Sequence, residues 1–258
     1  MNVTRVSVTL LALPVFGLAG CGNASLPAGP VAPAKARPLV HDSKVGITWV
    51  SIPGGTFRYG CEPHDTACHP NEKPGQSTSV QPFWLMQTEV TISAYRLCKV
   101  GGACTEPGTS ATQCNWGRPG RDDHPINCVD VAQATAFCEW LGARLPTGPE
   151  WEYAAKSGSS RVFPWGDGEP DMSLAHHAAE LTAPVGSHSP GATPWGLEDM
   201  AGNVNEWTTD ELKPGFAVAR GGSFAFPDAG RLRASNRGGG PLTLRAGNFG
   251  FRCARAES

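Results

Sequence analysis

This chain of 258 residues has little charge and no long apolar stretch. Charged residues make up 17% of it and the formal net charge is −2, which excludes a disordered polyelectrolyte and gives no electrostatic case for nucleic-acid binding. The apolar run Val6–Leu18 is too short for a membrane-spanning helix. Glycine and proline are abundant, at 32 and 23 residues, and they favour one loop-rich domain over a helical or doubly wound fold.

The N-terminus has the features of a targeting segment. Arg5 precedes the apolar run, and together they predict a signal peptide over residues 1–20. The run ends in Leu18-Ala19-Gly20-Cys21, which resembles a bacterial lipoprotein cleavage site, so Cys21 is expected to carry the lipid. The alternative is an ordinary secretory signal that leaves Cys21 unmodified.

Residues 21–44 are expected to form a tether, because the segment is rich in proline and alanine and has almost no large apolar residues. The folded domain is predicted to occupy residues 45–258. The lipid is expected to anchor this domain in the cell envelope. Because Gly22 is not an aspartate that would retain the protein at the inner membrane, the outer membrane or cell surface is favoured.

Local patterns predict several elements of that domain. Ile47–Ile52 and Thr56–Tyr59 are expected to pair with each other around Pro53-Gly54-Gly55. Helices are expected after three capping residues, which are Thr91, Asp130 with Gln133, and Thr147 with Glu150. The adjacent His176 and His177 are expected to be solvated, since neighbouring residues of a regular element do not face one metal.

The chain has nine cysteines, and eight remain once Cys21 is set aside. An even number in an exported chain suggests four disulfides, although eight cysteines allow 105 pairings. Cys61 and Cys68 flank His64 and His69, so a zinc site is an alternative to a local disulfide there.

The segment Trp195–Trp207 has aromatic ends and a polar centre. Asp199 and Glu206 can supply carboxylate oxygens, and the carbonyls of Gly202 and Val204 can complete the oxygen-rich shell that calcium requires. Gly202 is expected to adopt a positive φ. The alternative is an ordinary capped turn, because the spacing is not that of an EF-hand.

The same segment, Gly196–Trp207, resembles the signature of the formylglycine-generating enzyme (sulfatase-modifying factor) family. The resemblance extends over Val45–Arg255 and implies an irregular α+β domain related to C-type lectin folds. Four further segments carry it, and they are Leu145–Ala155, Phe163–Gly166, Arg220–Phe224 and Asn248–Cys253.

The resemblance also implies particular sites. It places a structural calcium on Asp199, Gly202, Val204 and Glu206. It pairs Cys138 with Cys253, and the remaining cysteines are then expected to pair as neighbours, Cys61 with Cys68, Cys98 with Cys104, and Cys114 with Cys128.

Active members of the family use copper held by two thiolates after the Arg-Gly-Gly-Ser sequence. Here the corresponding segment Arg220–Arg237 contains no cysteine. Phe226 and Arg231 stand near the two ligand positions, so bound copper is not expected. Ser223 is expected to keep a structural role, and Asn205 occupies a position that is usually tryptophan.

Two functions follow as hypotheses. The first is a non-catalytic module that binds a protein, peptide or glycan, with no nucleic-acid partner. Its groove is expected to include Asn205, Ser223, Phe224, Phe226, Arg231, Arg233 and Asn236. The alternative is an oxidase that converts a sulfatase cysteine to formylglycine, or an iron-dependent relative, so the sequence leaves the enzymatic question open.

Overall fold

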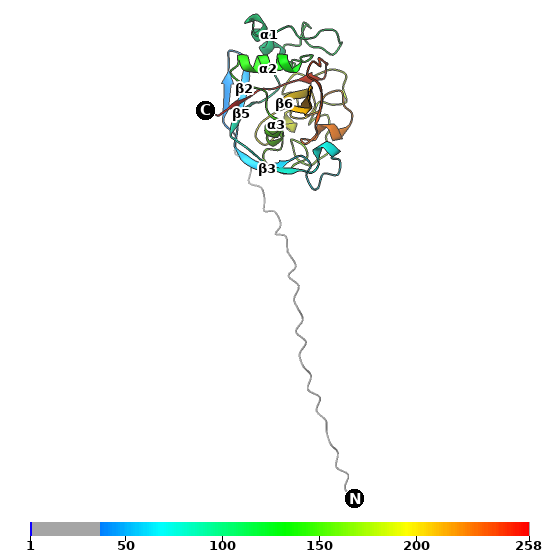
Figure 1. Cartoon of the computed structure of the whole chain (residues 1–258). Coiled ribbons are helices and arrows are strands. Elements are labelled where there is room, and N and C mark those ends of the chain that lie inside the picture. Colours follow the sequence, from blue (N-terminus) through cyan, green and yellow to red (C-terminus); the bar gives the residue numbers. More distant parts are fainter. Residues whose placement is uncertain (2–36, 258) are drawn as a thin grey trace. The chain divides into compact units, whose positions relative to one another are not determined.

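The computed structural model describes Met1 and residues 37–257, and residues 37–257 form an α+β domain (Figure 1). Apart from Met1, the expected signal peptide 1–20 lies outside the described residues, as do Cys21 and the tether as far as residue 36. None of the described helices is both long and apolar enough to cross a bilayer.

Three α-helices lie within residues 37–257, and each starts at a predicted cap. The Thr91 hydroxyl accepts the amide of Ala94, while Asp130 and Thr147 each form a complete capping box. The α-helices are α1 (Ile92–Val100), α2 (Val131–Trp140) and α3 (Gly148–Ala155), and the 3₁₀ turns are η1 (Pro70–Glu72), η2 (Ser189–Gly191) and η3 (Ala229–Leu232).

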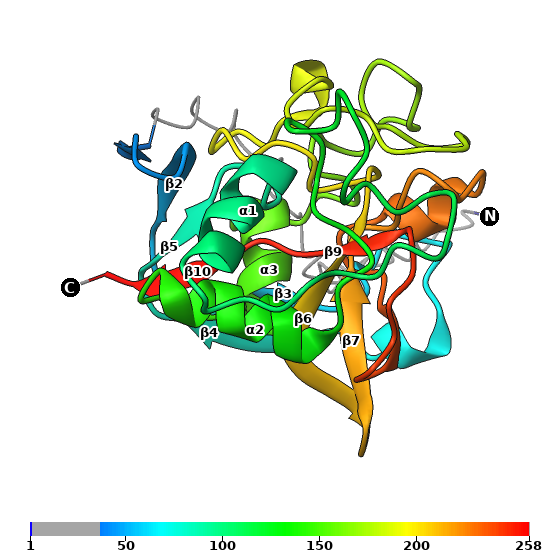
Figure 2. The same cartoon turned by 90° about the horizontal axis from the view of Figure 1, so that it is seen from above.

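The strands of the described residues are short and distributed over three sheets. They are β1 (Leu39–Asp42), β2 (Ile47–Ile52), β3 (Gly55–Tyr59), β4 (Gln76–Val80), β5 (Phe83–Met86), β6 (Asn205–Lys213), β7 (Phe216–Arg220), β8 (Gly238–Pro241), β9 (Phe249–Gly250) and β10 (Ala254–Ala256). The sheet orders are β1-β2-β5-β10, β3-β4 and β8-β7-β6-β9. Only the β6–β9 pair among these is parallel, and Figure 2 shows β6 and β7 as a long ribbon beside the helices.

The first sheet begins earlier than the sequence analysis predicted. Strand β1 lies inside the residues expected to form the tether, and it pairs antiparallel with β2. A turn closes this hairpin, with the Asp42 carbonyl accepting the amides of Val45 and Gly46. Leu39 and Val40 are exposed, so backbone pairing rather than side-chain burial holds β1 in place, and composition did not reveal it.

The predicted pairing of Ile47–Ile52 with the next strand is wrong. Strand β2 has the predicted bounds, but it pairs with β1 and β5, whereas β3 pairs with β4. The Pro53-Gly54-Gly55 turn passes the chain from one sheet to another instead of closing a hairpin. Gly54 packs against Pro82 so closely that a Cβ there would lie 2.8 Å from the proline Cδ.

Two main groups of buried side chains form the core. One joins α1, α2 and the centre of β6, and Figure 1 shows α1 and α2 at the same end of the domain. The other lies between α3 and strands β2 and β5. Four disulfides link the described cysteines in the pairs expected, Cys61–Cys68, Cys98–Cys104, Cys114–Cys128 and Cys138–Cys253.

Candidate functional site

The loop Trp195–Trp207 is fixed at both ends by its tryptophans. The Trp207 ring stacks on Phe249 with centroids 4.6 Å apart, and Trp195 packs edge-to-face on Tyr153 at 5.2 Å. Between them Gly202 has the expected positive φ, at +83°. The polar centre of the loop is therefore held rigidly against the core.

Glu206, one of the two expected calcium carboxylates, lies in a buried ion pair with Arg252. One carboxylate oxygen accepts from Arg252 Nε and from the Trp151 indole, each at 2.7 Å, and the other accepts from Arg252 Nη2 at 2.7 Å. Both oxygens of Glu206 thus already have partners. The guanidinium is saturated as well, because it also donates to the carbonyls of Met86, Gln87 and Glu198.

The sequence analysis did not anticipate Glu89, which lies beside this pair. Its side chain is buried, and neither carboxylate oxygen has a hydrogen-bond partner in the described part of the chain. Burial raises the pKa of the Glu89 carboxyl well above its usual value, the charge of Asp199 raises it further, and Arg252 opposes the shift. The only sequence signal for Glu89 is that it is the one carboxylate between β5 and α1.

Asp199 sits in the left-handed region at φ +55°, and its Oδ2 accepts the Gly186 amide at 2.6 Å. The carboxylates of Glu89, Asp199 and Glu206 therefore lie close enough to repel one another electrostatically. The positive charge of Arg252 partly offsets this repulsion. Such an excess of buried negative charge is costly unless a cation or protons neutralise it.

A hard cation in this place would need a ligand set different from the expected one. Glu89 offers free oxygens and Asp199 offers Oδ1, whereas Glu206 is occupied by Arg252. The three carboxylates do not form a group of ligand atoms all within 4.8 Å of one another; the group of that kind found in the described residues is Asp65, Cys68 and Glu72. Backbone carbonyls of the loop would have to supply further oxygens.

The family resemblance places copper ligands near Phe226 and Arg231, and these two side chains contact each other. The guanidinium carbon of Arg231 lies 4.8 Å from the Phe226 ring centroid. Neither side chain can replace a thiolate, and all eight cysteines of residues 37–257 are in disulfides. The residues of this region therefore do not fit a copper ion held by sulfur.

The other expected groove residues are mostly buried and do not line one open groove. The Asn205 amide donates to the Asn248 carbonyl at 3.0 Å, and Ser223 is buried with no partner for its hydroxyl among the described residues. Phe224, Arg233 and Asn236 are also buried. Only Phe226 and Arg231 of this set reach the surface, since Phe226 is half-buried and Arg231 is exposed.

A cavity of about 610 Å³ opens next to this segment. Phe224 and Ala225 form one wall, and residues 179–181 form another. These two segments are joined by backbone, because the Ala179 amide donates to the Phe224 carbonyl at 2.8 Å. The lining mixes polar and apolar groups, and its remaining members are Thr112, Gln113 and Arg118.

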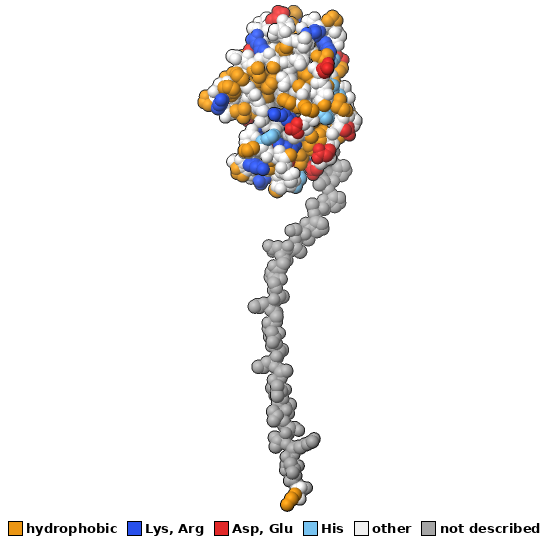
Figure 3. All heavy atoms as spheres, turned by 90° about the vertical axis from the view of Figure 1, so that its right-hand side faces the viewer, with side chains coloured by type: hydrophobic (Ala, Val, Ile, Leu, Met, Phe, Trp, Pro, Cys, Tyr) orange, Lys and Arg blue, Asp and Glu red, His pale blue; other side chains and the backbone are white. Residues whose placement is uncertain are grey.

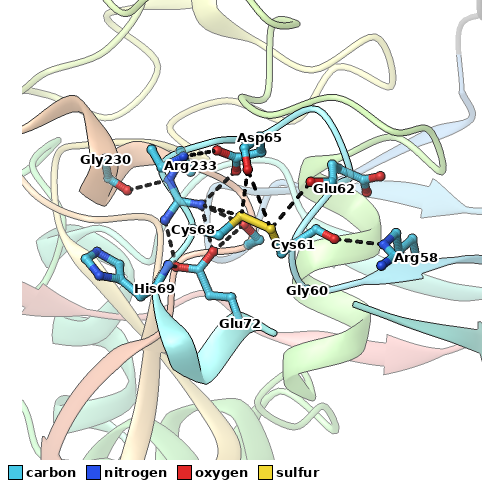
Figure 4. The surroundings of a disulfide bond; sticks show 12 residues. Arg58, Gly60, Cys61, Glu62, Asp65, Cys68, His69, Glu72, Gly230 and Arg233 are labelled. Atoms are coloured by element: carbon cyan, nitrogen blue, oxygen red, sulfur yellow. Dashed lines mark hydrogen bonds and ion pairs between the residues drawn. A yellow bond between two sulfur atoms is a disulfide. The ribbon is translucent and has the colours of Figure 1, made fainter. Parts of the chain in front are cut away.

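Arg233 is buried and closes an internal ion-pair network (Figure 4), at the edge of a second pocket of about 290 Å³ that it helps to line. Its guanidinium contacts Glu72 at 2.6 Å and Asp65 at 2.8 Å. Burial alone would raise the pKa of Glu72, but hydrogen bonds from Arg233 and Ser235 hold that pKa below its usual value. The network ties the Cys61–Cys68 loop to the segment around η3.

The zinc alternative for this loop is wrong, because the sulfur atoms of Cys61 and Cys68 are joined to each other. His64 lies 3.6 Å from Asp167 at the surface. The one group of three possible ligand atoms in the described residues is Asp65, Cys68 and Glu72, and both of its carboxylates already form ion pairs with Arg233. Figure 4 shows this guanidinium packed against the disulfide.

A family model described as "Sulfatase-modifying factor enzyme 1-like domain" matches residues 38–257. Formylglycine-generating enzyme of Streptomyces coelicolor is 30% identical in a match that covers 80% of this chain and 88% of that protein. Inactive C-alpha-formylglycine-generating enzyme 2 of Bos taurus is 27% identical, covering 81% of this chain and 88% of that protein.

Hercynine oxygenase of Mycolicibacterium smegmatis is 32% identical in a match that covers 66% of this chain. The chain spans about half of that relative, since the match covers 47% of it. Among solved structures, PvdO from Pseudomonas aeruginosa superposes with a TM-score of 0.74 at 26% identity, covering 86% of this chain and 99% of that one.

Proposed function

The chain belongs to the sulfatase-modifying factor enzyme 1-like family, whose domain spans residues 38–257, and from that premise we propose that it is a copper-free binding module. The family includes named enzymes and a relative named as inactive, so membership alone does not decide between catalysis and binding. The decision has to come from the side chains at the site.

One observation carries the proposal: the positions where copper thiolates are expected hold Phe226 and Arg231, stacked on each other. Cu(I) selects soft thiolate ligands, and the cysteines of residues 37–257 are consumed by disulfides. An exposed arginine over an aromatic ring is instead typical of recognition surfaces.

The ligand is proposed to be a protein, peptide or glycan that contacts Phe226 and enters the adjacent cavity of about 610 Å³. The face of the domain shown in Figure 3 mixes apolar, cationic and anionic side chains without a broad field of one sign. Recognition would then depend on local contacts rather than on long-range electrostatic attraction.

The alternative is an active oxidase, which the identity to the Streptomyces coelicolor enzyme favours. We expect the full chain, supplied with copper and oxygen, to leave unchanged a peptide bearing a sulfatase's modifiable cysteine. Mass spectrometry of the peptide is the readout, and the Streptomyces coelicolor enzyme is the positive control. Conversion of the cysteine by the chain at a rate near the control's would overturn the proposal.

The binding half of the proposal is tested on peptide and glycan arrays. We expect array signals of the wild-type chain to fall at least about tenfold with Phe226→Ala or Arg231→Ala, since central aromatic and arginine contacts dominate binding energy. Arg245→Ala is a matched control, because Arg245 is an exposed arginine that pairs with Asp130 instead. If no array signal depends on Phe226 or Arg231, this surface is not the binding site.

We also propose a structural calcium ion at the loop that contains Asp199, Gly202 and Val204, with Glu89 as an added carboxylate. The support is electrostatic: a divalent cation would neutralise the excess charge around Arg252 and would give the unpartnered oxygens of Glu89 a ligand role. Glu206 would then not bind the calcium itself but would hold Arg252 in place.

Calcium is expected to raise the thermal unfolding midpoint by on the order of 5–10 °C at a concentration about 100 times its dissociation constant. In Glu89→Gln this shift should fall by at least about half. Glu139→Gln is the control, since Glu139 is an exposed glutamate on α2. A full calcium shift in Glu89→Gln would contradict the assignment of Glu89.

Export and lipid anchoring are proposed from the N-terminal sequence, and the four disulfides support an oxidising compartment. The proposed location is the outer membrane or cell surface. Cys21→Ser is expected to abolish labelling by a fatty-acid analogue and to move the protein from the membrane to the soluble fraction. An unlabelled wild-type protein would leave an ordinary secretory signal as the explanation.

A further inference from the structure

His176 and His188 lie close together beside the loop Trp195–Trp207. Their ring centroids are 5.2 Å apart and the ring planes are inclined by 44°. The His176 carbonyl accepts the Asn203 amide at 2.8 Å, which fixes this backbone against the loop. Both rings are half-buried. Of the two histidines expected to be solvated, His177 departs from the expectation, because both its ring nitrogens are buried without a hydrogen-bond partner among the described residues.

The hydrogen bond of His176 fixes its tautomer. Its Nε2 lies 2.8 Å from the Leu181 carbonyl oxygen, and a carbonyl can only accept, so Nε2 carries the proton. The lone pair is therefore on Nδ1. A ring N–H given to a backbone carbonyl is the arrangement that orients metal-binding histidines.

The tautomer of His188 follows from its neighbour Ser187. The Ser187 hydroxyl donates to the Pro184 carbonyl at 2.6 Å, so its oxygen is left to accept from His188 Nδ1 at 3.3 Å. The lone pair of His188 is then on Nε2.

Two imidazoles bound to one tetrahedral ion, with metal–nitrogen bonds of about 2.0–2.1 Å, have ring centroids roughly 5 Å apart. The observed separation of 5.2 Å matches that geometry. We propose that His176 and His188 form an open two-histidine site for a divalent transition metal such as Zn²⁺, for which Cu²⁺ can serve as a spectroscopic probe. It is distinct from the proposed calcium ion, because imidazole nitrogens suit transition metals and calcium takes oxygens.

The site is open because no third histidine, cysteine, aspartate or glutamate in the described residues completes a group of three ligand atoms within 4.8 Å. Water or a group from a bound ligand would occupy the remaining positions. A metal with exchangeable positions at this place would offer a side chain or carboxylate of an incoming molecule a coordination bond. It would extend recognition by the domain beyond the Phe226 surface.

The test is a Zn²⁺ titration of the full chain by calorimetry, with calcium present in excess. One equivalent is expected to bind with a dissociation constant on the order of micromolar, and His176→Ala and His188→Ala should each weaken binding at least about tenfold. His41→Ala is the matched control, because His41 is an exposed histidine on β1. All three variants should keep the wild-type unfolding midpoint.

Electron paramagnetic resonance of the Cu²⁺-loaded wild-type chain gives an independent readout. Splitting from imidazole nitrogens is expected, and it should be lost in His188→Ala and retained in His41→Ala. Absence of tight Zn²⁺ binding overturns the proposal, and so does binding that both His176→Ala and His188→Ala leave unchanged.

Discussion

Replacing both Cys138 and Cys253 by alanine is expected to lower the free energy of unfolding by about 4–5 kcal/mol. This disulfide spans 115 residues along the chain, so it removes more freedom from the unfolded state than the other three. Both cysteines are buried, one on α2 and the other directly before β10. The loss should appear in urea unfolding as a lower midpoint.

The matched control is the double alanine variant of Cys98 and Cys104, which are also buried but only six residues apart. The same entropy relation gives a loss of about 2 kcal/mol for so short a loop. The prediction is therefore the difference between the two variants. Equal losses would mean that local packing, and not the constraint on the unfolded chain, accounts for the stabilisation.

Arg252→Met is expected to cost about 3–5 kcal/mol, because it leaves Glu206 buried without its cationic partner. The guanidinium is fully buried, contacts both oxygens of Glu206 and satisfies three backbone carbonyls. Methionine retains much of the volume, so the loss reports mainly on the uncompensated charge. Chemical denaturation with and without calcium is the measurement.

Two further variants show whether the stranded charge on Glu206 causes that loss of stability. Adding Glu206→Gln to Arg252→Met removes the stranded charge and is expected to restore part of the stability. Arg96→Ala breaks the exposed pair with Asp122 and should leave the midpoint nearly unchanged. If the double variant is less stable than Arg252→Met alone, the charge on Glu206 is not what destabilises the single variant.

The sequence predicted those parts of the fold that local chemistry decides. The caps at Thr91, Asp130 and Thr147 were found because each side chain bonds to an amide three residues away. The bounds of β2 were found because its residues are almost all buried and β-branched or aromatic. The family fold followed from the motif around Gly202.

Strand partners could not be predicted in the same way, because they are distant in sequence. The turn at Gly54 looks like a hairpin turn, yet β2 pairs with β5 and β3 pairs with β4. The neighbour of β2 is decided by the place where Pro82 and the strand after it pack. A local sequence pattern cannot predict that place.

The candidate site shows the same limit. Asp199 and Glu206 were singled out because they lie in one motif, but Arg252 is 46 residues from Glu206 and saturates it. Glu89 comes from yet another segment and joins them only in the folded chain. The sequence predicts that Phe226 and Arg231 stand in place of copper ligands, but it does not predict that the two side chains contact each other.

The short segment from Phe249 to Ala256 has a consequence for how the domain is made. It supplies β9, Arg252, Cys253 and β10, and each of these contacts a segment far back in the sequence. As the chain is synthesised from its N-terminus, it can form the three short-range disulfides early, because their cysteines are at most 14 residues apart. Its core is completed only once residues 249–256 have joined these distant segments, so we expect assembly of the domain to depend on late, long-range contacts.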